Sequence, residues 1–204
     1  MLFRSPGRSG AETAPHLIDQ VRSSLGEFAG VSAGLPRVAE HRWAAEDSFS
    51  VRFRLTNGVE GVMHESASDW GPPMFMTRVA GTSGTLWIEG GAVRVADSAG
   101  TRTLPVPDDL TALPSDPLPS GPLPSGPPPA DLLASDYDRM RSGVGEIPPS
   151  IRLYQTFGDL INGKPVPADP RPGTFADGVA AMAVIDAIRQ SAASAGAWVA
   201  VTSD

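Results

Sequence analysis

The sequence predicts an α+β fold in which helices pack on one face of an open, mainly antiparallel β-sheet. Three observations support this class. Apolar and polar residues alternate in residues 48–56, as they do in a strand with one buried face. An Asn57-Gly58 turn and further short strands with tight turns follow, which is typical of an antiparallel meander. Segments with helical spacing of apolar residues stand towards both ends of the chain.

An apolar stripe predicts a helix in residues 10–25, and its members are Leu17, Ile18, Val21 and Leu25. Pro15 interrupts the start of this segment. A proline costs little in the first turn of a helix and much in its interior. The helix proper is therefore expected to begin near Ala14.

Strands are expected between this helix and a proline-rich segment, with glycine-containing turns between most of them. Their predicted ranges are 28–38, 48–56, 59–68, 75–79, 85–89, 92–96 and 102–106.

Two helices and a short strand are predicted in the last third of the chain. The first helix covers residues 151–161, and Asn162-Gly163 ends it. The second begins after Thr174, where Asp177 three residues later completes a variant of the capping box, and it runs to about residue 193. The strand covers residues 197–201.

Composition favours one ordinary domain that spans residues 1–204. The chain has 204 residues, of which 41% are hydrophobic, enough for a single core. Its net charge is −7 and its basic residues are scattered, so nucleic acid and anionic membrane surfaces are poor partners. No apolar run approaches the roughly 18 residues of a membrane helix. The absence of cysteine excludes disulfides and thiolate metal sites and fits a cytoplasmic protein.

Residues 105–129 form a proline-rich segment of low complexity. It contains the direct repeat Pro-Leu-Pro-Ser-Gly, which can form neither a ladder nor a helix. An exposed, extended loop is the favoured interpretation over a lid or a proline-motif ligand.

The strongest candidate for a chemical site is the set Glu12, His16 and Asp19. Their spacing of i, i+4 and i+7 places them on one face of a helix. Carboxylates beside an imidazole orient the ring and favour a proton acceptor near neutral pH. A substrate hydrogen-bonding group and a histidine that only caps the helix start are the alternatives. Metal binding is less favoured, because the set holds a single imidazole.

Two further features leave alternatives open. Trp70, followed by Pro72 and Pro73, either lines a sugar-binding cleft or anchors a loop. Arg52 and Arg54 lie on the exposed side of their strand, where they either reach a partner subunit or are solvated.

Several stretches in order resemble the C-terminal domain of the Gfo/Idh/MocA family of NAD(P)-dependent sugar and polyol oxidoreductases. The segment from Pro15 to Asp19 resembles the family's His-x-x-Asp helix. Residues 79–86 resemble its Gly-Thr-x-Gly hairpin, and Tyr154, Phe157 and Gly163 fit its late helix. Residues 174–192 resemble the closing helix, with Trp198-Val199 just beyond.

This resemblance implies a substrate-holding and oligomer-building half of a two-domain oxidoreductase. In the family, a Rossmann half binds NAD or NADP and the chemistry takes place between the halves. The family's Asp-x-x-x-His element falls on Glu12 and His16, with a glutamate in place of the aspartate, and its following aspartate falls on Asp19. The resemblance also implies a sugar or polyol ligand and a homo-oligomer formed through the open sheet face.

The sequence contains no G-x-G-x-x-G after a strand, so no Rossmann domain is expected and the chain alone should bind no cofactor. Gly163-Lys164-Pro165 superficially resembles the family's Glu-Lys-Pro motif but is best interpreted as an exposed turn. The expected function is that of a substrate-binding half, inactive alone, whose turnover needs a separate Rossmann-domain protein. The alternative is a non-catalytic, homo-oligomerising binding module.

Overall fold

The structure is a computed structural model that describes residues 14–38, 46–66, 68, 75–89, 91–106, 147–166 and 171–202. The candidate residues Glu12 and Trp70 lie outside these ranges, as does most of the proline-rich segment. The chain divides into two compact units, which are treated separately below. The first holds both ends of the described chain, and the second holds the residues between them.

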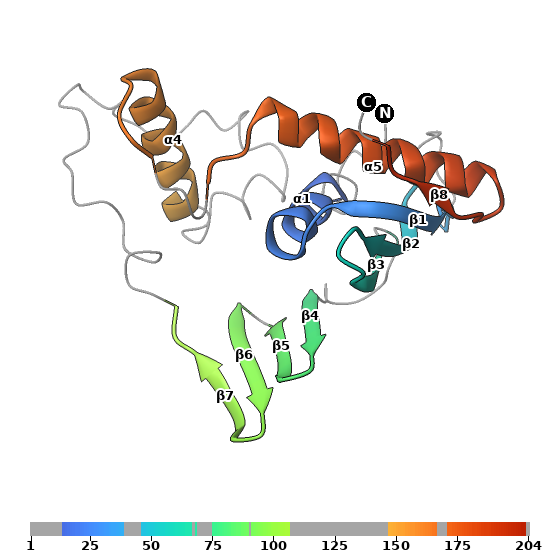
Figure 1. Cartoon of the computed structure of the whole chain (residues 1–204), viewed down its shortest axis with the longest axis horizontal. Coiled ribbons are helices and arrows are strands. Elements are labelled where there is room, and N and C mark those ends of the chain that lie inside the picture. Colours follow the sequence, from blue (N-terminus) through green and yellow to red (C-terminus); the bar gives the residue numbers. More distant parts are fainter. Residues whose placement is uncertain are drawn as a thin grey trace. The chain divides into compact units, whose positions relative to one another are not determined.

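The first unit is a four-stranded antiparallel sheet with two helices (Figure 1). The strand order is β3-β2-β1-β8. The strands are β1 (Phe28–Gly34), β2 (Ser48–Leu55), β3 (Glu60–Ser66) and β8 (Val199–Ala200). The helices are α1 (Ala14–Leu25) and α5 (Phe175–Ala193), and α5 packs against both β1 and α1.

The alternation in β2 separates the two faces of this sheet. Phe49, Val51, Phe53 and Leu55 are buried, whereas Ser50, Arg52 and Arg54 are exposed. The buried side chains meet Ile18 of α1 and four positions of α5 in one core, and these positions are Val184, Ile185, Ala187 and Ile188. Both helices therefore cover the apolar face, as the sequence predicts, and the arginine-bearing face stays open.

Two glycines are required by the hairpin that joins β2 to β3. Gly58 adopts a φ of +88°, which side-chain-bearing residues rarely tolerate, and its amide donates to the Leu55 carbonyl. Gly61 lies opposite Phe53, and a Cβ there would collide with the phenyl ring. The predicted Asn-Gly hairpin is thus confirmed, with a second glycine that makes room for a core ring.

The second unit contains a four-stranded antiparallel meander in the order β4-β5-β6-β7. Its strands are β4 (Met76–Gly81), β5 (Gly84–Glu89), β6 (Ala92–Asp97) and β7 (Gly100–Leu104), and its helix is α4 (Ile147–Ile161). The α+β class with antiparallel strands is confirmed, but the strands form two sheets instead of one. The prediction that residues 1–204 form a single domain stays a prediction.

The boundaries of most elements agree with the sequence. The first helix begins at Ala14 with Pro15 in its first turn. Thr174 caps α5, and the reciprocal contacts of the capping box with Asp177 are both present. None of the described helices is long and apolar enough to cross a membrane.

Leu55, which is 1% exposed, tests the position of the core in the first unit. Substitution Leu55→Ala should lower the free energy of unfolding by about 2–5 kcal/mol, because it leaves a cavity among side chains that cannot collapse fully. The matched control Val62→Ala changes a residue that is 79% exposed on the open face, and it should change stability by less than about 0.5 kcal/mol. Equal losses in urea denaturation would contradict this placement.

Candidate functional site

Helix α1 presents His16 and Asp19 to the outside of the first unit. Ala14 and Ile18 are buried in the core, which fixes the opposite side of the helix as the exposed one. His16 and Asp19 are both exposed and lie three residues apart, so they share that side. No described residue forms a hydrogen bond with the His16 ring, which leaves it accessible to a ligand or partner. Because Glu12 lies outside the described ranges, its alignment with these two residues stays a prediction.

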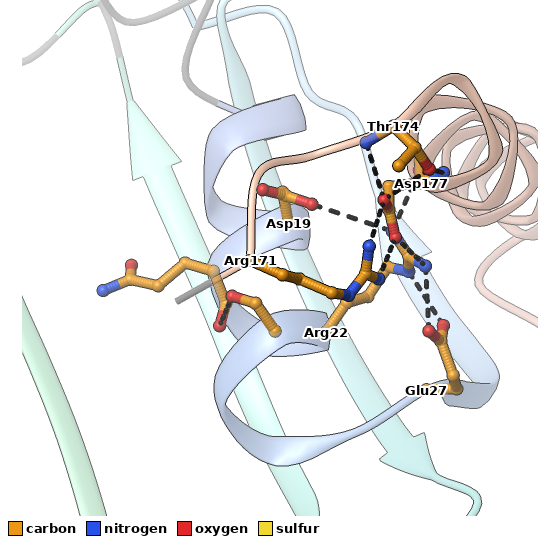
Figure 2. Close-up of polar contacts among 8 residues, drawn as sticks. Asp19, Arg22, Glu27, Arg171, Thr174 and Asp177 are labelled. Carbon is orange, nitrogen blue, oxygen red and sulfur yellow. Dashed lines mark hydrogen bonds and ion pairs between the residues drawn. The ribbon is translucent and has the colours of Figure 1, made fainter. Parts of the chain in front are cut away.

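A buried arginine on the same helix anchors this face. Arg22 is 8% exposed, and its guanidinium donates two parallel hydrogen bonds to Glu27, each 2.8 Å long. Its third contact is a 2.9 Å hydrogen bond to the backbone carbonyl of Asp177 at the start of α5. Figure 2 shows Arg22 between Asp19, Glu27 and Asp177. The pKa of Arg22 is raised, chiefly by the hydrogen bond to Glu27, so the buried group keeps its charge.

The Asp177 carboxylate extends this network on α5. It accepts hydrogen bonds from Arg171, at 2.9 and 2.6 Å, and from the Thr174 amide at 2.8 Å. The Thr174 hydroxyl donates a further bond of 2.7 Å. These contacts, Arg171 first, hold the pKa of Asp177 well below its usual range. We call the six connected residues the Arg22 cluster; they are Asp19, Arg22, Glu27, Arg171, Thr174 and Asp177.

The Arg22 cluster connects the His16 face to the start of α5. Asp19 lies 3.7 Å from the Arg22 guanidinium, and Asp177 lies at the same distance on the other side. Asp19 thus contributes one carboxylate to a held arginine and keeps more than half of its side chain exposed. Chemically, this arrangement supplies an accessible imidazole beside a carboxylate on a helix that cannot rotate without breaking the Arg22 contacts.

Neither of two hollows in this unit includes His16 or Asp19. An apolar cavity of about 10 Å³ lies beneath α1, where Ile18 meets Phe49 and Ile188, and it is too small for a substrate. An open groove of about 750 Å³ lies on the open face of the sheet, lined in part by Ser50, Arg52 and His64. Among the described residues, the His16 face therefore lies outside both of these hollows.

Other candidate residues have ordinary surroundings or stay untested. Lys164 pairs with Asp159 at 2.9 Å in an exposed turn where Gly163 has a φ of +66°. The described residues contain no group of three or more His, Cys, Asp or Glu side chains arranged to hold a metal ion. Trp70 stays a prediction, because the structure does not describe its position.

Sequence reasoning found the capping pair Thr174–Asp177 but missed Arg22, Glu27 and Arg171. One signal for Arg22 was available, since it lies four residues after Ile18 and so shares its buried side. Its acceptor at Asp177 is 155 residues away, and no local pattern connects the two.

Comparison with known proteins agrees with this geometry. Residues 7–87 match the family model described as the GFO/IDH/MocA C-terminal domain. This segment holds α1, with His16 and Asp19, the strands β1 to β4 and part of β5. The resemblance predicted from the sequence is thereby confirmed for residues 7–87, which make up about two fifths of the chain. No curated protein matches it by sequence.

Solved structures of dehydrogenases share the fold. A levoglucosan dehydrogenase in complex with NADH and levoglucosan matches with a TM-score of 0.64 and 23% identity, over 94% of this chain and 50% of that one. An Agrobacterium radiobacter oxidoreductase in complex with NAD+, L-tartaric acid and magnesium matches with a TM-score of 0.63 and 20% identity, over 97% of this chain and 50% of that one. The WlbA dehydrogenase from Bordetella pertussis, with NADH and UDP-GlcNAcA, matches with a TM-score of 0.56 and 15% identity, over 97% of this chain and 49% of that one. This chain thus spans about half the length of each.

The depressed pKa of Asp177 predicts a pH-dependent contribution to stability. Substitution Asp177→Asn should lower the melting temperature by several degrees at pH 7, because the ion pair with Arg171 is lost. The difference should shrink as the pH falls below about 4, where the carboxyl of the unfolded chain becomes protonated and the wild type loses the benefit of ionisation. Circular dichroism melts between pH 7 and pH 2 measure this.

The matched control is Asp186→Asn, which breaks an exposed ion pair with Arg189 on the same helix. It should change the melting temperature little at any pH. A wild-type advantage over Asp177→Asn that stays constant down to pH 2 would contradict the assigned role of Asp177.

Proposed function

We propose that this chain supplies the substrate-binding half of an NAD(P)-dependent oxidoreductase that acts on a sugar or polyol. The observation that carries the proposal is the exposed His16–Asp19 face, held by the buried Arg22, in a fold shared with NAD(H)-bound dehydrogenases of twice the length. The relatives' ligands, levoglucosan and L-tartaric acid, suggest small polyhydroxylated substrates.

The described residues offer no cradle for the cofactor's pyrophosphate. A dinucleotide site needs a strand that leads through a glycine-rich turn into a helix N-terminus, and no described strand leads directly into a helix. When bound by a nucleotide-binding half outside residues 1–204, the nicotinamide would accept a hydride from the substrate carbon. We accordingly propose that the chain by itself gives no turnover.

In this proposal His16 takes up the proton of the substrate hydroxyl as the carbon loses its hydride, so that alcohol becomes carbonyl. Asp19 acts as a positioning residue, since its carboxylate is held at 3.7 Å from Arg22 on the same helix. Glu12 would orient the imidazole from one turn earlier, and Trp70 would stack on the sugar ring.

An apolar stripe on α5 suggests where the second half docks. Phe175, Val179 and Met182 are 98%, 64% and 47% exposed and share one side of the helix. The same side continues with the polar Asp186 and Gln190. The stripe thus begins beside the Arg22 cluster, and a nucleotide-binding partner that covers it would lie next to the His16 face.

Calorimetry with levoglucosan, L-tartrate and a neutral polyol such as myo-inositol tests the retained site. Substitution His16→Ala should weaken the best ligand about tenfold, because it removes a hydrogen-bonding partner of the reacting hydroxyl. The control His64→Ala removes a histidine from the open sheet face and should leave the affinity unchanged. Binding that responds to His64 and not to His16 would defeat the proposal, as would robust NAD-dependent oxidation by the purified chain alone.

The open face of the first sheet favours a second candidate, a non-catalytic module that self-associates. Val62, 79% exposed, lies on this face with the groove described above, and Trp198, 46% exposed, lies over it beside Arg54. A second copy stacked on this face would remove both apolar side chains from water.

Sedimentation velocity tests self-association through this face, and the calorimetry above tests whether the same chain also binds a ligand. Val62→Glu should convert a dimer to a monomer, because it places a charge in the proposed contact. Val179→Glu, a matched change on the helix-covered side, should leave the dimer intact. A wild type that is monomeric at 100 µM, or a dimeric Val62→Glu variant, would contradict self-association through this face.

A further inference from the structure

The sheet of the second unit carries a cross-strand row in which two arginines flank a tryptophan. Arg78 of β4 pairs with Trp87 of β5, and Trp87 pairs with Arg94 of β6. Directly paired residues of antiparallel strands point to the same face, so the three side chains lie next to one another. Thr103 of β7 extends the row by one position.

Both arginines are exposed and lack a carboxylate partner among the described residues. Six other arginines in the described ranges each pair with an acid, namely Arg22, Arg52, Arg54, Arg102, Arg171 and Arg189, whereas Arg37 likewise has no described ion pair. Glu89 shares the face one row away and forms no described ion pair with Arg78 or Arg94. In a chain of net charge −7, two arginines without a described ion pair, whose backbones lie roughly 10 Å apart across two strand spacings, form a local positive site.

The next cross-strand row on the same face leaves space beside the indole of Trp87. It consists of small side chains, which are Ala80, Thr85, Ala96 and Thr101. Trp87 is itself only partly buried. As far as the described strands are concerned, a ring can therefore lie against Trp87 with no bulky neighbour on that side.

We infer that this row binds a sugar ring that carries anionic groups, either carboxylate or phosphate. Trp87 provides the apolar face for the ring, and each arginine provides a planar pair of donors for an anion at the edge. The spacing of the arginines on both sides of the ring favours a sugar with two anionic groups over a sugar with one. Stacked nucleic acid bases would use the same groups, but the net charge of −7 and the scattered basic residues oppose a polyanion.

The site is independent of the proposed function, because it lies on the second unit and uses no residue of α1. An experiment that refutes the role of His16 therefore leaves this site untouched, and the reverse also holds.

Titration of the full chain with four ligands tests it, namely glucose 1,6-bisphosphate, glucose 6-phosphate, glucuronic acid and glucose. Calorimetry should give the bisphosphate the highest affinity, the two sugars with a single anionic group a lower one and glucose none, with binding that weakens as salt rises. The order of glucose 6-phosphate and glucuronic acid tells which anion is preferred. Arg78→Gln and Arg94→Gln should each weaken the bisphosphate about tenfold, and ligand-induced fluorescence change should vanish in Trp87→Phe.

The matched control is Arg102→Gln, which changes an exposed arginine on the opposite face of the same sheet. Arg102 lies opposite Val95 in the strand register and forms an ion pair with Asp97. It should leave the affinity unchanged. Three results would overturn the inference: no binding of any anionic sugar, equal effects of Arg102→Gln and Arg94→Gln, or tighter binding of a single-stranded oligonucleotide than of the bisphosphate. Inorganic phosphate that binds as well as glucose 1,6-bisphosphate would overturn the part assigned to Trp87.

Discussion

The ionic contacts of Arg22 are the constraint on which the rest of the first unit depends. A buried guanidinium is costly unless its donors are satisfied. Here Glu27, in the turn between α1 and β1, and the backbone carbonyl of Asp177, at the start of α5, accept its hydrogen bonds. The same contacts therefore fix the roll of α1, the start of α5 and the turn into β1. Because α1 cannot roll, His16 and Asp19 face outward while Ile18 fills the core.

Each face of the first sheet follows from this arrangement. The helices cover the side formed by Phe49, Val51, Phe53 and Leu55, so the arginine side of β2 is left to water or to a partner. The proposed chemistry and the proposed self-association consequently use different surfaces. A chain that has lost one role can keep the other, which makes the two candidate functions separable by experiment.

The sequence predicted those features that depend on neighbouring residues. Alternation located β2, Asn57-Gly58 located its hairpin, Pro15 set the start of α1 and Thr174 with Asp177 set the start of α5. Features that depend on distant residues were missed. The partner of Arg22 lies 155 residues away, and the separation of the strands into two sheets is set by pairings that local alternation does not encode. His16 and Asp19 lie on one face as their spacing predicts, whereas the positions of Glu12 and Trp70 stay predictions.

We propose above that the His16 face, which Arg22 holds in place, contributes one side of a binding site for a polyhydroxylated substrate. Imidazole NMR signals test it most directly, since the chain has three histidines that single substitutions can assign. On addition of levoglucosan or L-tartrate, the chemical shifts of His16 should change until the ligand saturates the site, and those of His64 on the open sheet face should not change. Shifts confined to His64, or none at His16 at saturating ligand, would contradict the account.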